Sequence, residues 1–262
     1  LDPYNAEAPM RALDSPITPE GLFYVRNHFP VPAVDPDQWR LTVDLYPGRK
    51  AMSQLALGDL QQLPRRTVTV TLECAGNGRT TLNPAPSGTP WAFGAVSTAA
   101  FSGTSLVNLL DGDLAADTVE LLFLGADNGR IATGETIHYG RSLTPTVAFH
   151  PDTILAWEMN GRPLPPEHGY PLRLVVPRWY GVASVKWLDE IRALATPYDG
   201  YYQTTDYLYN GQAGLADGTP VTCMRVRSVI ASPVAGQVVN PGPQVISGTA
   251  WSGDAPVVAV EV

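Results

Sequence analysis

Cys74 is the residue with the most distinct chemical potential in this sequence. It follows TVTVTLE at 67–73, a run of alternating β-branched residues, and is itself followed by Ala-Gly-Asn-Gly-Arg. Small residues after a strand let another group approach the backbone closely, and the nearby Arg79 favours a thiolate. Cys74 is therefore a candidate nucleophile or soft-metal ligand, and the alternative is a small buried core residue.

The motifs of several other chemistries are missing from the sequence. It contains no GxSxG, HExxH or CxxC, no GxGxxG after a strand and no Walker loop. A nucleophilic cysteine needs a base, yet no sequence neighbour singles out one of His28, His138, His150 and His168. The residues alone thus indicate a reactive thiol or a soft-metal site with arginines nearby.

Composition restricts the classes of protein that could carry such a site. The 262 residues include 25 prolines and 24 glycines, with 44% hydrophobic and 16% charged residues. This mixture excludes intrinsic disorder and a long coiled coil, and predicts short strands joined by many turns. A net charge of −8 excludes free nucleic acid as a partner, because phosphate binding needs a basic surface. No apolar run approaches the ~18 residues of a membrane span.

Hydrophobic patterning predicts the elements that position Cys74. Segments 40–46, 67–73 and 118–124 alternate or are apolar and predict strands, and 104–110 predicts a short helix. Helical spacing over 53–63 predicts a helix with Ser53 as its N-cap.

The hydrophobic pattern of the sequence changes after about residue 210. A Gly-rich linker leads into short strands separated by Pro and Gly turns, a pattern typical of β-sandwiches. About fifty residues remain there, fewer than the ~100 of a complete sandwich. We therefore expect an incomplete second domain.

Three segments together resemble the sulfite oxidase family of molybdenum enzymes. They are FYVRNHFPVP at 23–32, CAGNGR at 74–79 and HGYPLRLVVPRWYGVASVKWL at 168–188, and the similarity runs from about residue 22 to about residue 210. The resemblance implies an α+β fold, with a mixed-sheet molybdopterin-binding catalytic domain over 1–210. It further implies that 211–262 form the N-terminal part of an immunoglobulin-like β-sandwich for dimerisation, apparently truncated.

The resemblance also implies a molybdenum cofactor, Mo-molybdopterin, with Cys74 as the protein thiolate on the metal. Arg26 would face the substrate, and Arg173 with Lys186 would bind the phosphate end. The residues expected to bind the cofactor are Tyr24, Val25, Arg26, Asn27, His28, Asp127, His168, Arg173, Ser184, Val185 and Lys186. For Asp127 an ordinary turn aspartate is the alternative.

For the substrate, the resemblance places Arg79, Trp91 and Tyr207 around an anion pocket. Trp91 as a plain core aromatic is the alternative, and Tyr209 competes with Tyr207. The implied reaction is oxygen-atom transfer that oxidises sulfite, or another small oxyanion, with Tyr207 binding the anion or assisting proton-coupled electron transfer. Two other functions stay open: a reductase of nitrate or a sulfoxide with the same fold, and a non-enzymatic secreted β-rich binding module.

Electrons are expected to pass to a separate acceptor such as a c-type cytochrome, because the sequence has no CxxCH haem motif. Pairing with a second copy would cover strand edges such as VVAVEV at 257–262. Leu1 in place of an initiator methionine indicates a processed or trimmed start. Removal of a signal peptide would favour a periplasmic or other extracytoplasmic location, and a cytoplasmic one is the alternative.

Overall fold

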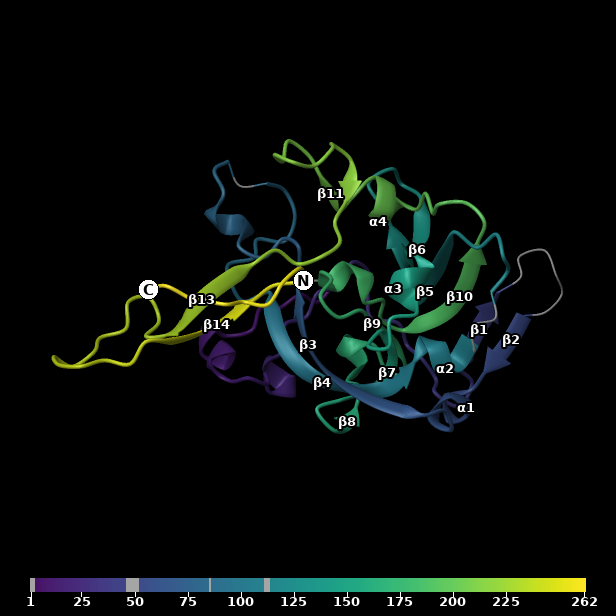
Figure 1. The fold of residues 1–262 in the computed structure, drawn as a ribbon, viewed down its shortest axis with the longest axis horizontal. Helices are drawn as coiled ribbons and strands as arrows, with labels where there is room; N and C mark the ends of the chain where they lie inside the picture. The colour runs from purple at the N-terminus through teal and green to yellow at the C-terminus, as the bar shows by residue number, and fades with distance from the viewer. Residues whose placement is uncertain (1–2, 46–51, 85, 111–113) are drawn as a thin grey trace.

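Two five-stranded sheets form the body of the chain (Figure 1). The structure, a computed structural model, describes residues 3–45, 52–84, 86–110 and 114–262. The first sheet has the order β2 (Met52–Leu55), β1 (Leu41–Asp44), β10 (Leu188–Leu194), β5 (Glu120–Arg130), β6 (Thr136–Leu143). It is mixed, because β1 pairs with β10 in parallel and the other neighbours are antiparallel.

The second sheet is antiparallel throughout. It comprises β3 (Arg65–Glu73), β4 (Val96–Ser105), β7 (Ile154–Met159) and β8 (Arg162–Pro163), with β9 (Arg173–Val175) also paired to β7. β3 and β4 pair along nine residues from Arg65↔Thr104 to Glu73↔Val96, which carries β3 directly to Cys74. The predicted strand before the cysteine is therefore confirmed and positions it at the end of a long ladder.

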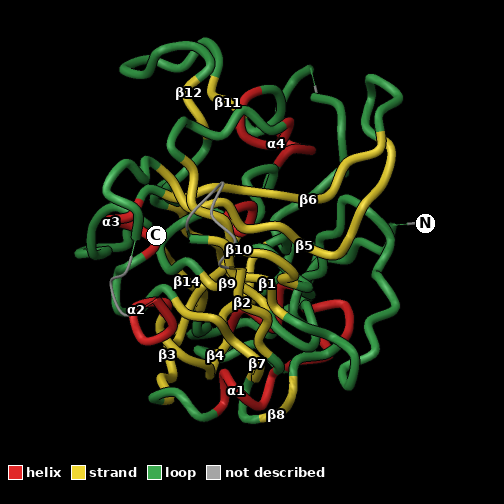
Figure 2. The backbone as a smooth tube through the Cα atoms, turned by 90° about the vertical axis from the view of Figure 1, so that its right-hand side faces the viewer, coloured by secondary structure: helices red, strands yellow, loops and turns green. Residues whose placement is uncertain are grey.

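Helices are few and short. They are α1 (Leu57–Gln61), α2 (Leu106–Leu110), α3 (Pro145–Ala148) and α4 (Tyr201–Thr204), with 3₁₀ turns η1 (Met10–Asp14), η2 (Glu20–Leu22), η3 (Arg79–Thr81), η4 (Pro166–His168) and η5 (Gly181–Ala183). Figure 2 shows these helices as small pieces around the two sheets, so the α+β class is confirmed. No helix of the described ranges has the length and apolar composition needed to cross a bilayer.

The predicted helix over 53–63 is wrong at its start. Ser53 is paired with Val43 in the β1–β2 ladder, and the helix begins only at Leu57. The backbone N–H of Ala56 donates to Asp59 Oδ2 at 2.8 Å, so a side chain of α1 itself caps the first turn. Strand pairing thus overrode the helical spacing of the preceding residues.

Two other predicted elements have different ends in the structure. β4 continues to Ser105, so the helix expected over 104–110 begins at Leu106. The strand expected over 118–124 continues to Arg130, so Asp127 lies on β5 and not in a turn.

From residue 208 on, the described chain forms two short antiparallel pairs. β11 (Leu208–Tyr209) pairs with β12 (Thr219–Pro220), and β13 (Arg227–Ser232) pairs with β14 (Ser247–Trp251). In Figure 1 the β13–β14 pair extends from the body in the yellow-green part of the chain. Both strands also contact η1, so this pair is attached to the N-terminal part of the fold.

Gly103 is a position where the second sheet has no room for a side chain. A Cβ there would lie 1.9 Å from the Leu155 carbonyl oxygen and 2.6 Å from the Ala156 Cα. We expect Gly103→Ala to lower the free energy of unfolding in urea by about 1–3 kcal/mol. A Cβ added at Gly58 in α1 would lie in open space, so Gly58→Ala should raise the free energy of unfolding by up to about 1 kcal/mol. Equal effects of the two substitutions would contradict this packing argument.

Candidate active site

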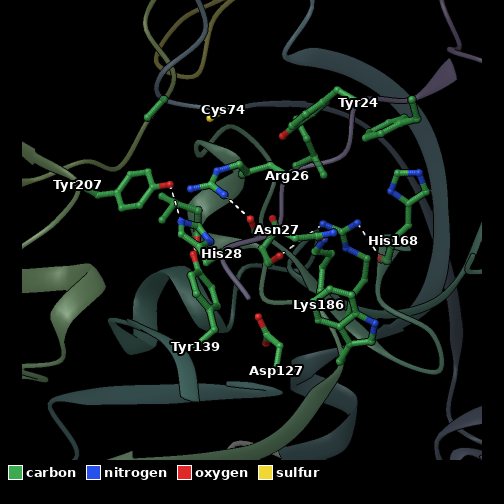
Figure 3. Close-up of a pocket in the computed structure, with 18 residues that line it drawn as sticks. Tyr24, Arg26, Asn27, His28, Cys74, Asp127, Tyr139, His168, Lys186 and Tyr207 are labelled. Atoms are coloured by element: carbon green, nitrogen blue, oxygen red, sulfur yellow. Dashed lines mark hydrogen bonds between the residues drawn. The ribbon is translucent and has the colours of Figure 1, made fainter. Parts of the chain in front are cut away.

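Residues from both sheets and from the segments that join their strands line a pocket. Most of the predicted site residues belong to this lining (Figure 3). Its empty volume, which includes space open to solvent, is about 640 Å³. The lining residues are Phe23, Tyr24, Arg26, Asn27, His28, Leu72, Cys74, Ala75, Asp127, Tyr139, His168, Arg173, Gly181, Val182, Ser184, Lys186, Trp187 and Tyr207.

Cys74 presents the single sulfur atom of this pocket's lining. Its backbone N–H donates to the Ala95 carbonyl at 2.9 Å, and its own carbonyl accepts the Asn77 N–H at 2.9 Å, which closes a turn directly after β3. Burial raises the pKa of the thiol, while Arg26 and Arg79 act in the opposite direction. A bound metal cation would shift the balance to the thiolate, because metal ligation removes the thiol proton.

Three cations converge on the pocket from different segments. Arg26 lies on the segment before β1, Arg173 begins β9, and Lys186 precedes β10. Lys186 Nζ donates to Asn27 Oδ1 and, at 2.8 Å, to the Glu167 carbonyl, while Arg173 Nη1 donates to the His168 carbonyl at 3.0 Å.

Burial disfavours the protonated forms of two of these cations. Burial, followed by the charge of Arg173, lowers the pKa of Lys186 well below its ordinary value. Burial lowers the pKa of Arg173 to about 10, against the opposing influence of Tyr24. Concentrated buried positive charge is costly unless an opposite charge compensates it. An anionic ligand would supply that compensation here.

Two buried polar atoms of the pocket have no hydrogen-bond partner among the residues that the structure describes. They are Oδ1 of Asp127 and Nε of Arg173. Burial raises the pKa of Asp127, with Lys186 opposing it, and the carboxyl group can then donate as well as accept. Unsatisfied buried polar groups are rare in native proteins. A ligand that carries ring nitrogens, amide groups and a phosphate fits this set of donors and acceptors.

Aromatic side chains surround His28 in the pocket. Its Nε2 lies 2.7 Å from the Tyr207 hydroxyl, and its ring stacks on Tyr139 at 4.8 Å between centroids. Burial, then Arg26 and Lys186, lower the pKa of His28 well below its usual value, so His28 is neutral at physiological pH. Tyr207 and Trp187 have φ of 60° and 48°, a left-handed conformation that is strained for bulky residues and clusters at functional sites.

Four predicted residues do not line the pocket. The backbones of Val25 and Val185 form hydrogen bonds with those of Ala6 and Leu174, which do not line the pocket either. Arg79 Nη1 donates to the Thr89 carbonyl at 3.4 Å, and Trp91 is buried in the cluster around β3 and β4.

Sequence reasoning missed seven lining residues: Phe23, Leu72, Ala75, Tyr139, Gly181, Val182 and Trp187. Most of them lie within or beside the three motifs and could have been included on that ground. Tyr139 could not, because it comes from β6 and its OH reaches the Val182 carbonyl at 2.7 Å only through the fold.

His168 makes the stability of this site dependent on pH. Burial, then Arg173 and Lys186, lower its pKa to about 3, whereas the unfolded chain binds the proton near 6.5. The unfolded state therefore holds more protons between these values, and the free energy of unfolding falls as pH decreases through this window. We expect His168→Gln to remove about 3–5 kcal/mol of that loss between pH 7 and pH 3.

The measurement is urea unfolding of the cofactor-free chain at several pH values. His150 is exposed, so His150→Gln serves as the matched control and should leave the slope unchanged. A wild-type slope in the His168→Gln variant would contradict the effect of burial.

Comparison with known proteins agrees with this geometry. Residues 28–202 match the family described as "Oxidoreductase molybdopterin binding domain". The chain belongs to this family of molybdopterin-binding oxidoreductases. This match, together with the sulfite oxidase relatives given next, confirms the resemblance to the sulfite oxidase family that the three motifs predict.

Its curated relatives include mitochondrial sulfite oxidase of Rattus norvegicus, 38% identical over 267 residues, which cover 96% of this chain and 48% of that protein. Nitrate reductase [NADH] of Cichorium intybus is 34% identical over 219 residues, covering 78% and 23%. Among solved structures, the sulfane dehydrogenase SoxCD from Paracoccus pantotrophus superimposes with a TM-score of 0.80 at 30% identity, covering 94% of this chain and 61% of that one. The chain spans about half the length of the rat sulfite oxidase that it matches.

Proposed function

We propose that this chain is a molybdenum-dependent oxidoreductase that oxidises sulfite to sulfate by oxygen-atom transfer. The overall reaction converts sulfite and water into sulfate, two protons and two electrons. The observation that carries the proposal is the convergence of one cysteine sulfur and three cations on a single pocket. The similarity to sulfite oxidases and to a sulfane dehydrogenase supports a sulfur oxyanion as substrate.

Mo-molybdopterin would be held along the length of the pocket. Cys74 is the proposed metal ligand, since a soft thiolate suits a metal already bound by sulfur. Arg173 and Lys186 would bind the phosphate end, and Asp127 Oδ1 would receive or donate a hydrogen bond at the pterin. When bound, the cofactor supplies the transferable oxygen atom and accepts two electrons.

Arg26 and Tyr207 would bind the substrate beside Cys74. Burial alone would lower the pKa of Arg26, but Tyr207 and Cys74 raise it overall, so the guanidinium stays charged and can hold an oxyanion. The Tyr207 hydroxyl can donate to Nε2 of the neutral His28. This pair offers a place to hold a proton near the substrate. Arg79 lies outside the pocket lining and would favour the negative charge on Cys74.

The domain division and the partners belong to the same proposal. Residues 1–210 would form the catalytic domain, and 211–262 would form the first part of an immunoglobulin-like dimerisation sandwich. The antiparallel β13–β14 pair is consistent with such a sandwich. A separate one-electron acceptor, such as a c-type cytochrome, would take the electrons.

The test couples metal analysis to an enzyme assay. Protein from a host that makes the cofactor should contain close to one molybdenum per chain and should reduce ferricyanide with sulfite. Metal-free protein would overturn both enzyme functions. The nitrate reductase similarity supports a second candidate: fast oxidation of a reduced dye by nitrate, with little sulfite turnover, would favour that reductase.

A further inference from the structure

Glu73, the residue immediately before Cys74, is a carboxylate with no exposed surface. Burying a carboxylate is costly unless hydrogen bonds and an opposite charge compensate it. Oε1 accepts from Asn77 Nδ2 at 3.1 Å and from Arg227 Nη1 at 3.0 Å, and Oε2 accepts from Trp251 Nε1 at 2.8 Å. Both oxygens are thus satisfied, and two of the three donors come from the C-terminal strands.

Arg227 and Trp251 reach Glu73 together because they are direct cross-strand partners in the β13–β14 pair. Opposite residues of an antiparallel pair lie on the same face of the sheet. The pair therefore presents a charged donor and a neutral donor side by side to a single carboxylate. Trp251 is buried, and the side chain of Arg227 is 38% exposed.

The same contacts extend to the turn that follows Cys74. The Asn77 carbonyl accepts from Arg227 Nη1 at 2.7 Å, and Asn77 Oδ1 accepts the Ala95 N–H at 3.1 Å. Gly78 has φ of 78°, and a Cβ there would lie 2.8 Å from Arg227 Nη2. Arg227 thus lies against both Glu73 and the end of the turn, so it connects the two residues that flank Cys74–Gly76.

None of these four side chains lines the pocket. They contact the turn from outside the pocket lining. The turn is short, and a small rotation of its backbone would redirect the Cys74 sulfur.

We propose that Glu73, Arg227 and Trp251 form a positioning network that holds the Cys74–Asn77 turn in the conformation that presents the Cys74 sulfur to the pocket. The inference deepens the proposed function and rests on it, because the direction of the sulfur matters for a metal ligand. The three residues are positioning residues and make no contact with the reacting atoms.

The test uses Trp251→Phe, which removes the donor to Oε2 and keeps an aromatic ring in place. The first measurement is the rate of Cys74 alkylation by iodoacetamide in the cofactor-free 262-residue chain at one pH, with Cys223 as the internal reference in the same digest. We expect about a tenfold faster reaction, because loss of a hydrogen bond to a charged group favours opening of the turn by about that factor. Backbone hydrogen exchange over 74–78 should accelerate in parallel.

Trp39→Phe is the matched control. Trp39 is as buried as Trp251, and its Nε1 has no hydrogen-bond partner within the described part of the chain. The control therefore loses the same side-chain volume without losing a hydrogen bond, and Cys74 should react at the wild-type rate. An equal acceleration in both variants, or none in Trp251→Phe, would overturn the network.

A double-mutant cycle separates positioning from general destabilisation. Glu73→Gln already removes the charged acceptor, so Trp251→Phe should add less than tenfold on that background. Full additivity would contradict a shared network. Molybdenum content is measured on the same proteins made with the cofactor: a metal-free wild type overturns the proposed function, whereas the alkylation rates decide the network on their own.

Discussion

Replacing Cys74 by serine is expected to reduce sulfite turnover to below about one-thousandth of the wild-type rate. Substitution of a residue that hydrogen-bonds to a metal ligand typically lowers metal affinity or activity by about 10–100-fold. Loss of the ligand itself is expected to lower activity further. Serine nearly matches cysteine in size, so the pocket around it should survive. The measurement is steady-state sulfite oxidation with ferricyanide, together with molybdenum and pterin content.

Cys223 provides the control for this substitution. It is the other free cysteine and lies outside the pocket. Cys223→Ser should keep wild-type turnover and metal content. Wild-type activity in Cys74→Ser would refute the assignment of Cys74 as the ligand.

Replacing Arg26 by methionine is expected to lower kcat/KM for sulfite by about 10²–10³-fold, the effect of removing one preorganised group that stabilises developing charge. Arg26 Nη1 donates to the Asn27 carbonyl, and at 3.4 Å to Asn5 Oδ1, so the guanidinium is oriented before substrate arrives. Lysine would keep the charge but lose the fork of donors that matches an oxyanion. Arg26→Lys should therefore fall between the wild type and Arg26→Met.

The control here is Arg40→Met, since Arg40 is exposed and bonds to the Asp37 carbonyl at 3.0 Å. Arg40→Met removes the same charge from a residue outside the pocket lining and should change kcat/KM by less than about twofold at moderate salt. Molybdenum content must stay near wild type in Arg26→Met. Unchanged kinetics in a metal-replete Arg26→Met variant would exclude Arg26 from substrate binding.

Local patterns were sufficient to predict the strand before Cys74. Its alternation of threonine and valine is the signature of a half-buried strand, and β3 begins within two residues of the predicted start. The motif at 168–188 likewise brought His168, Arg173 and Lys186 to one pocket. These residues belong to one family motif, so the resemblance predicted them together.

Features that depend on register could not be predicted in this way. The pairing of Val43 with Ser53 converted an expected helix start into a strand. Tyr139 reaches the pocket because of how β5 and β6 pair, which shifts register between Leu124 and Asn128. Neither pairing can be predicted from a short window of sequence, because each depends on a partner strand elsewhere in the chain.

Arg79 shows a related limit. The family resemblance implied a place for Arg79 in the anion pocket, but the structure places its guanidinium against Gly76 and Gly88. Glycine at these two positions makes room for it, since a Cβ at Gly88 would lie 1.9 Å from Arg79 Nη1. A motif match alone cannot tell whether a side chain turns toward or away from a pocket.

The order in which the strands pair also bears on how this protein is made. β1 near the start of the chain has β10 as its parallel neighbour, and Glu73 obtains two of its donors only from Arg227 and Trp251. During translation the ribosome must therefore release the chain well past residue 194 before the first sheet can close, and past residue 251 before the turn at Cys74 has all its supports. The pocket of a nascent chain stays unfinished until residue 251 has left the ribosome, so loading with cofactor is expected to come after that point.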